Sequence, residues 1–135
     1  MRSYLQKHTG IKYSDDYSTP KDIYTKYVID KEYYDPCELY HDDTDLENDL
    51  INDNMFINPP YSNIAAWCDF AIKHSELYRK HIILLIPSRT DTRYFHRLLE
   101  HGVDLEFIKG RLTFGSMKAP APFPSVLVHF NRKEK

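Results

Sequence analysis

The tetrapeptide Asn58-Pro59-Pro60-Tyr61 combines residue types that can act together on one planar nitrogen. The side-chain oxygen of Asn58 and the backbone carbonyl of Pro59 can both accept hydrogen bonds from the same amino or amide group. The two prolines fix the backbone and supply no competing N–H, and the Tyr61 ring can stack on a flat group. The tetrapeptide therefore predicts activation of a weakly nucleophilic exocyclic nitrogen by preorganised electrostatics. The alternative is a turn that ends a strand, since Asn and Pro are turn formers.

The residues on either side of the tetrapeptide predict the elements that position it. Met55-Phe56-Ile57 is a short apolar run typical of a buried strand. Ser62 or Asn63 can cap a following helix, whose apolar face consists of Ile64, Trp67, Cys68, Ala71 and Tyr78. Ligands of open α/β sheets bind beyond the carboxyl ends of the strands, so the tetrapeptide occupies a position suited to a site.

The rest of the chain alternates between strand and helix patterns. We expect a helix from an N-cap at Thr19 to about residue 29, and a second helix that is capped by Thr90 or Asp91 and ends at Gly102. A short strand is expected at Tyr33-Tyr34, followed by a loop at 38–54. Further strands are expected at 81–86, 103–107 and 125–130. This order predicts an α/β fold with a mostly parallel central sheet flanked by helices. A length of 135 residues fits one domain over 1–135, with 1–16 as a flexible N-terminal arm.

The net charge of −2 conceals a strong asymmetry along the chain. Residues 1–67 hold 6 Lys/Arg against 13 Asp/Glu, a net charge of −7, and residues 68–135 hold 12 against 7, a net charge of +5. Such a chain could hold a cationic ligand and an anionic ligand on different faces. The longest apolar run, Ile82 to Ile86, is too short to cross a bilayer, and the two cysteines give no disulfide framework and no metal-ligand spacing. We therefore expect a cytoplasmic protein with no membrane partner and no metal.

Stretches beyond the tetrapeptide carry a more specific resemblance. Asn-Pro-Pro-Tyr is similar to the catalytic motif of S-adenosylmethionine-dependent amino-methyltransferases, which act on adenine, cytosine, guanine or protein glutamine. Over nearly its whole length the chain resembles the small phage-type DNA N6-adenine methyltransferases. The matching stretches, in order, are residues 17–20, 35–37, 56–62, 86–92 with 95–96, 109–114 and 121–125.

The resemblance implies a compact Rossmann-like methyltransferase fold, S-adenosylmethionine as cofactor and adenine in DNA as substrate. It implies that Asn58 and the Pro59 carbonyl hold the adenine amino group, with Pro60 in the same motif. It also implies that Tyr61 stacks on a base flipped out of the duplex. A source in a phage or another virus follows from the same likeness, and with it a place in the host cytoplasm.

The resemblance also implies a set of cofactor-binding residues, with Asp35 opposite the methionine ammonium. The implied set is Thr19, Pro20, Asp35, Pro36, Cys37 and Asp45. Thr19 as a helix cap, Asp35-Pro36 as a turn and residues 42–53 as a solvated acidic loop are the plainer alternatives. The family pattern has an Asp-Gly pair where this chain has Asp45-Leu46, and no glycine lies between Asp35 and Asn58.

The basic half supplies candidates for contact with DNA phosphates. They are Arg89, Arg93, Arg111 and Lys118, which fall near predicted loops. The alternative is a solvated charged surface. A chain this short lacks a separate domain for reading the target sequence, so a homodimer could supply more DNA surface.

The sequence therefore supports one leading hypothesis and two alternatives. The leading hypothesis is a site-specific DNA adenine N6-methyltransferase. The first alternative is an amino-methyltransferase for RNA or for a protein glutamine. The second is a catalytically weak relative that binds DNA or cofactor without turnover, motivated by the missing glycine after Asp35.

Overall fold

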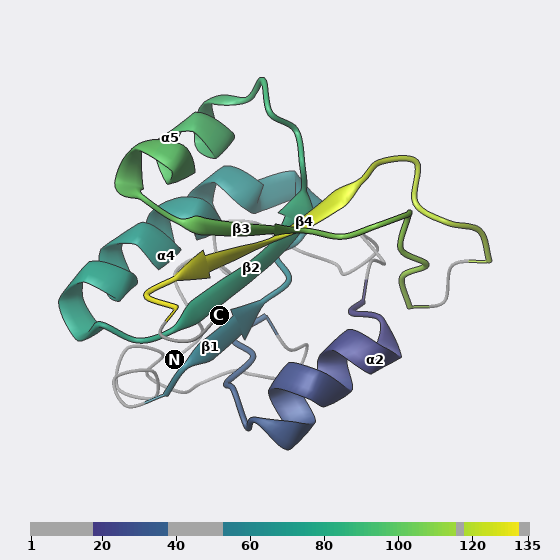
Figure 1. Cartoon of the computed structure of the whole chain (residues 1–135), viewed down its shortest axis with the longest axis horizontal. Coiled ribbons are helices and arrows are strands. Elements are labelled where there is room, and N and C mark those ends of the chain that lie inside the picture. The colour runs from purple at the N-terminus through teal and green to yellow at the C-terminus, as the bar shows by residue number, and fades with distance from the viewer. Residues whose placement is uncertain (1–17, 38–52, 116–117, 133–135) are drawn as a thin grey trace.

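A computed structural model describes residues 18–37, 53–115 and 118–132. The fold is α/β, as predicted. Helices α4 (Ile64–Tyr78) and α5 (Arg93–His101) cover one face of a four-stranded sheet. The short helix α2 (Lys21–Tyr24) and the π-helical turn η1 (Thr25–Asp30) lie on the other face (Figure 1). The predicted arm at 1–16, the acidic stretch at 38–52 and with it Asp45 lie outside the described residues.

The sheet has the strand order β1-β2-β4-β3, with bounds Met55–Ile57, Ile82–Pro87, Ser125–Phe130 and Asp104–Phe107. Strands β1 and β2 are parallel, whereas β4 is antiparallel to both of its neighbours, β2 and β3. The prediction of a Rossmann-like, mostly parallel sheet is therefore not confirmed, because only one of the three described strand pairs is parallel. Strands β1, β2 and β3 point the same way, but β4 returns in the opposite direction between β2 and β3. A loop, not a crossover helix, joins β3 to β4, so the two strands can pair antiparallel.

The predicted strand at Tyr33-Tyr34 is reduced to a single bridge. Tyr34 pairs in parallel with Met55, its N–H donates to the Asn54 carbonyl at 2.8 Å, and its carbonyl accepts from the Phe56 N–H at 2.9 Å. Pro36 follows two residues later and cannot donate to a ladder. The bridge nevertheless fixes the chain before Asp35 alongside β1.

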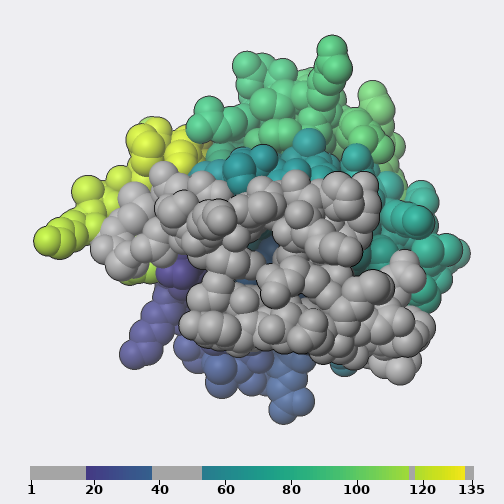
Figure 2. Space-filling model, turned by 180° about the vertical axis from the view of Figure 1, so that it is seen from behind, coloured from purple at the N-terminus to yellow at the C-terminus, as the bar shows by residue number. Residues whose placement is uncertain are grey.

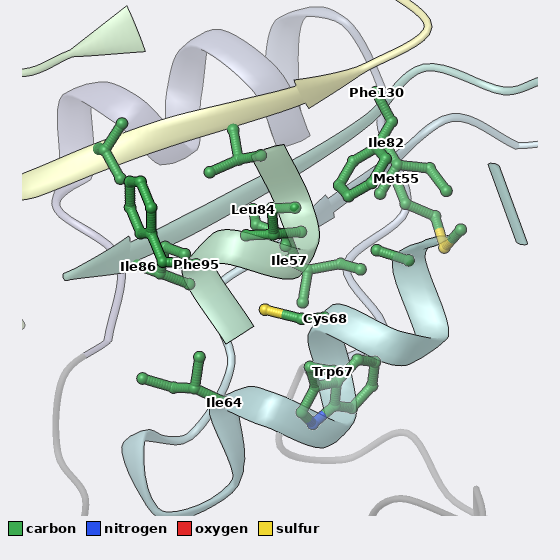
Figure 3. Close-up of a cluster of buried hydrophobic side chains, with 14 residues drawn as sticks. Met55, Ile57, Ile64, Trp67, Cys68, Ile82, Leu84, Ile86, Phe95 and Phe130 are labelled. Atoms are coloured by element: carbon green, nitrogen blue, oxygen red, sulfur yellow. The ribbon is translucent and has the colours of Figure 1, made fainter. Parts of the chain in front are cut away.

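The apolar run of β2 is buried throughout because both faces of the sheet are covered. Ile82, Leu84 and Ile86 pack in the cluster that includes residues of α4 and α5. Figure 3 shows Trp67 and Cys68 of α4 in this cluster together with Ile57 and Leu84. The alternate β2 residues, Ile83 and Leu85, belong to a second cluster on the opposite face with Tyr27 of η1.

Helix α4 presents the predicted apolar face but begins without the predicted cap. Ile64, Trp67, Cys68 and Ala71 are buried, and Tyr78 is half-buried. A 3-10 turn, η2 (Tyr61–Asn63), leads into the helix, and Asn63 occupies the N-cap position without a side-chain capping bond. The turn therefore links the tetrapeptide directly to α4.

The other two predicted helix caps are also wrong in detail. The side chain that caps α5 belongs to Thr92, which accepts from the Phe95 N–H at 3.3 Å, and neither Thr90 nor Asp91 occupies that position. Gly102 closes α5 in the left-handed region, as predicted, at a φ of 95°. At α2 the N-cap position belongs to Pro20, so Thr19 lies one residue too early to cap the helix.

Two further expectations concern membranes and metals. Within 18–37, 53–115 and 118–132, no helix combines the length and the apolar character needed to cross a bilayer. The same residues contain no group of three or more His, Cys, Asp or Glu side chains that could hold a metal ion.

Candidate active site

Asn58 lies at the carboxyl end of β1, where the chain leaves the buried sheet. Its amide Nδ2 donates a hydrogen bond to the Thr19 hydroxyl at 3.1 Å, across 39 residues of sequence. The other end of the amide, Oδ1, is buried. The tetrapeptide is therefore placed as predicted, and its first side chain is held by the segment that precedes α2.

The two prolines extend the site in different ways. Pro59 is buried and Pro60 half-buried, and both follow trans peptide bonds. The Pro60 carbonyl accepts from the Asn63 N–H at 2.9 Å and so forms part of the turn η2. Of the two proline carbonyls, this leaves the Pro59 carbonyl as the candidate to act with Asn58 Oδ1.

Tyr61 belongs to an aromatic cluster that we define as Tyr61, Phe114 and Phe123. The Tyr61 ring centroid lies 5.3 Å from that of Phe123 and 6.2 Å from that of Phe114, nearly edge-on to Phe114. The two phenylalanines are themselves 6.2 Å apart and are buried. Tilted and edge-to-face contacts at these separations are favourable, so the cluster fixes the position of the Tyr61 ring.

The segment that carries Thr19 packs against the end of the Phe114 segment. Gly115 has a φ of +37°, and a Cβ built there would collide with the side-chain oxygen of Ser18. Glycine thus permits this close approach. Figure 2 shows the start of the described chain, in purple, next to the yellow-green loop that precedes β4. Three separate stretches of sequence therefore meet around Asn58 and Tyr61.

Asp35 lies alongside β1, because Tyr34 pairs in parallel with Met55 and the chain then runs toward the carboxyl end of that strand. Its Oδ1 accepts from the Cys37 N–H at 3.1 Å, so the predicted turn at Asp35-Pro36 is confirmed. Desolvation by burial and the negative charge of Asp35 both raise the pKa of the Cys37 thiol well above its usual value. Cys37 is therefore a neutral thiol here and no activated nucleophile.

The four predicted DNA-binding residues fall into two groups. The Arg89 guanidinium lies 5.8 Å from the Phe123 ring centroid, and Arg111 Nη1 donates to the Ala121 carbonyl at 3.5 Å. Both exposed side chains thus border the loop that contributes Phe123 to the aromatic cluster. Arg93, at the start of α5, and Lys118, in the same loop as Phe123, are also exposed, but no described contact joins either side chain to the aromatic cluster.

Sequence reasoning missed three contributors to the site. Phe114 and Phe123 were not assigned a role, although both lie in stretches that carry the family resemblance. The contact between Ser18 and Gly115 joins residues almost a hundred positions apart, and no local pattern indicates it. One signal was available, namely the scarcity of glycine, which makes each of the four positions informative.

The α/β sheet thus carries an amide, two prolines and an aromatic side chain after the carboxyl end of β1, and open α/β sheets bind their ligands beyond the carboxyl ends of their strands. The comparison with known families gives the class a name. The chain belongs to the DNA N-6-adenine-methyltransferase (Dam) family, whose sequence pattern matches residues 6–125. The resemblance drawn from six stretches is thereby confirmed. No curated protein and no solved structure matches the chain.

Proposed function

We propose that this protein transfers a methyl group from S-adenosylmethionine to the N6 amino group of an adenine in DNA. Membership of the family supports a DNA adenine methyltransferase. The observation that carries the proposal is the position of Asn58, held by Thr19 at the carboxyl end of β1 and followed by Pro59 and Tyr61. The proposal assigns these residues to the adenine, which is flipped out of the duplex.

The chemistry assigned to the tetrapeptide is activation without a strong base. Asn58 Oδ1 and the Pro59 carbonyl accept the two N–H bonds of the adenine amino group, which raises electron density on the nitrogen. Two fixed acceptors also orient the nitrogen toward the methyl donor. Tyr61 stacks on the base, and the aromatic cluster keeps its ring in place.

The negative charge of Asp35 is complementary to the positive charge of the proposed cofactor. S-adenosylmethionine carries a positive ammonium and supplies an electrophilic methyl group on a positive sulfur. Asp35 follows the residue that pairs with β1, the strand that leads to Asn58, and its negative charge favours a nearby cation. We assign Asp35, Pro36 and Cys37 to this pocket, together with Pro20. Asp45 remains a prediction for the ribose hydroxyls.

The phosphate contacts are assigned to the basic half of the chain. Arg89 borders the aromatic cluster through Phe123, and Arg111 contacts the same loop through the Ala121 carbonyl, so we assign both to the strand that delivers the flipped adenine. We assign Arg93 and Lys118 to secondary phosphate contacts. A homodimer that adds DNA surface stays a prediction, which scattering with and without DNA would test.

The proposal is tested by transfer of labelled methyl groups from S-adenosylmethionine to DNA, followed by analysis of the modified base. Wild type should form N6-methyladenine, and Asn58→Ala should reduce the rate by about 10²- to 10³-fold, as loss of a preorganised polar contact does elsewhere. Asn63→Ala is the matched control, since this asparagine starts α4 without a side-chain capping bond.

Other outcomes would replace the proposal. Methylation of RNA or of a glutamine-containing peptide in place of DNA would move the enzyme to another amino-group substrate. Calorimetry that finds DNA binding without S-adenosylmethionine binding would favour a catalytically weak relative. Equal activity of wild type and Asn58→Ala would remove Asn58 from the chemistry.

A further inference from the structure

We propose that Thr19 is a positioning residue, which fixes the orientation of the Asn58 amide and does not bind the cofactor. This inference rests on the proposed function, because it concerns how the adenine amino group is held. It replaces the expected role of Thr19 as a cofactor contact with one that follows from a described hydrogen bond.

The two ends of the Asn58 amide have opposite chemistry. Oδ1 can accept from the amino group of adenine, whereas Nδ2 is a donor and would oppose those N–H bonds. The Thr19 hydroxyl accepts from Nδ2 at 3.1 Å and so provides this donor with a partner on the N-terminal side of the site. Because Nδ2 bonds to Thr19, Oδ1 points away from Thr19. The acceptor oxygen of Asn58 therefore has its orientation before substrate binds.

Thr19 can act in this way because the chain on both sides of it is restrained. Ser18 is in close contact with Gly115, and Pro20 follows with a φ of −56° and a ψ of 145°. The Pro20 carbonyl accepts from the Tyr24 N–H at 2.9 Å at the start of α2. A residue before proline is itself confined to extended backbone, so the hydroxyl has little freedom to move away.

The same arrangement explains why Thr19 is not the helix cap that its sequence context predicts. Pro20 occupies the N-cap position of α2, and the helix has no side-chain capping bond. The Thr19 hydroxyl is therefore directed at Asn58 in place of the first turn of α2. Thr19, a residue type that often caps helices, therefore forms a contact between distant segments of the chain and does not cap α2.

Two substitutions separate the hydroxyl from the shape of the side chain. Thr19→Val removes the acceptor and keeps the branched form, while Thr19→Ser keeps the acceptor and removes the methyl group. We expect Thr19→Val to lower kcat about ten- to a hundredfold, with KM for DNA and Kd for S-adenosylmethionine changed less than about threefold. Thr19→Ser should retain most of the activity.

Two kinetic results would overturn the inference. A large rise in Kd for S-adenosylmethionine in Thr19→Val, with unchanged kcat, would show that Thr19 contacts the cofactor. Equal loss of kcat in Thr19→Ser and Thr19→Val would show that packing of the methyl group, and not the hydroxyl, is what matters.

A measurement without turnover makes the outcome independent of the reaction. The side-chain amide signals of Asn58 in a nitrogen–proton NMR spectrum can be assigned by their absence in Asn58→Ala. Thr19→Val should shift this pair in the cofactor-free protein, and Thr19→Ser should leave it near its wild-type position. An unmoved pair in Thr19→Val rejects the role of Thr19, whereas absence of methyl transfer by wild type rejects the proposed function itself.

Discussion

The two ends of the sheet use polar side chains in different ways. At the carboxyl end of β1, Asn58 and Tyr61 are held by segments from elsewhere in the chain, through Thr19 and the aromatic cluster. At the amino ends of β1 and β2, polar groups bond mainly to one another. His81 precedes β2 there, and His129 on β4 lies opposite Ile83. Under the proposed function the first end orients groups for a ligand, whereas the second end forms an internal network of polar side chains.

The internal network runs through four side chains. The Tyr33 hydroxyl lies 2.6 Å from His81 Nδ1, His81 Nε2 lies 2.9 Å from His129 Nδ1, and His129 Nε2 lies 2.9 Å from Glu106 Oε1. A carboxylate only accepts, so the proton of neutral His129 is on Nε2 and its Nδ1 accepts from His81. His81 Nδ1 then accepts from the Tyr33 hydroxyl. Each neutral imidazole thus donates once and accepts once.

Charge would disturb this network, because a protonated imidazole has no acceptor. Desolvation, followed by the neighbouring His129, Arg132 and Lys31, lowers the pKa of His81 to about 4. Desolvation also lowers the pKa of His129, although the hydrogen bond to Glu106 opposes this shift. Both histidines are therefore neutral near pH 7. We therefore expect the network to contribute to stability, and under the proposed function we expect the other end to contribute to chemistry.

The strongest test of this contrast is to break the network at its centre. His129→Ala removes a buried side chain and its bonds to His81 and Glu106, so the free energy of unfolding should fall by about 2 to 3 kcal/mol. The folded fraction should keep its methyl-transfer rate, unlike Asn58→Ala, which should lose the rate and keep most of the stability. Denaturant titration and the transfer assay measure the two effects. Loss of rate in folded His129→Ala would join the two ends into one functional unit.

A smaller effect is expected where the aromatic cluster both stabilises the fold and positions Tyr61. Phe123→Leu should cost about 1 kcal/mol of stability and lower methyl transfer about tenfold, because Tyr61 loses the ring contact with Phe123 at 5.3 Å. Phe95→Leu, on the opposite face of the sheet, is the matched control. It should cost similar stability without a loss of rate. If both variants lose activity equally, the cluster has no special relation to Tyr61.

These two regions also differ in how far sequence predicted them. The apolar runs of β1, β2 and β4 and the apolar face of α4 were predictable, because local periodicity reports burial. The tetrapeptide was placed correctly because it follows such a run. The antiparallel position of β4 was not predictable, since periodicity does not say which strand a long loop returns to. The contact of His81 with His129 depends on that arrangement, and the contact of Thr19 with Asn58 joins segments that are far apart in the sequence.

Acid should weaken the network in a defined window of pH. The pKa of His81 is about 4 in the folded protein, below the value of about 6.5 for an unfolded histidine, so the unfolded chain binds more protons between these values. Stability should therefore fall as pH is lowered from 6.5 toward 4, by less than about 1.4 kcal/mol per unit for one group, because His81 is only half-buried. Melting temperatures across this range measure the slope.

The control for the acid effect is a histidine outside the network. His81→Phe should flatten the pH dependence between 6.5 and 4, whereas His96→Ala should leave the slope in place, because His96 is exposed on α5 and bonds to the Thr90 carbonyl. An unchanged slope in His81→Phe would mean that other groups, such as carboxylates, determine the acid sensitivity.

The smallest effects are expected for the proposed phosphate contacts of Arg89 and Arg111, near the carboxyl end of β1. Each of Arg89→Ala and Arg111→Ala should weaken DNA binding a few-fold and reduce the slope of log affinity against log salt by about 1, because one phosphate contact is lost. Arg97→Ala is the matched control, since this exposed arginine pairs with Asp69 where α5 packs on α4, away from the aromatic cluster. A binding titration at several salt concentrations gives all three slopes. Equal salt slopes for all three variants would mean that DNA binds the basic half of the chain without preferred arginine contacts. In that case only the tetrapeptide and the aromatic cluster would distinguish this end of the sheet from the rest of the surface.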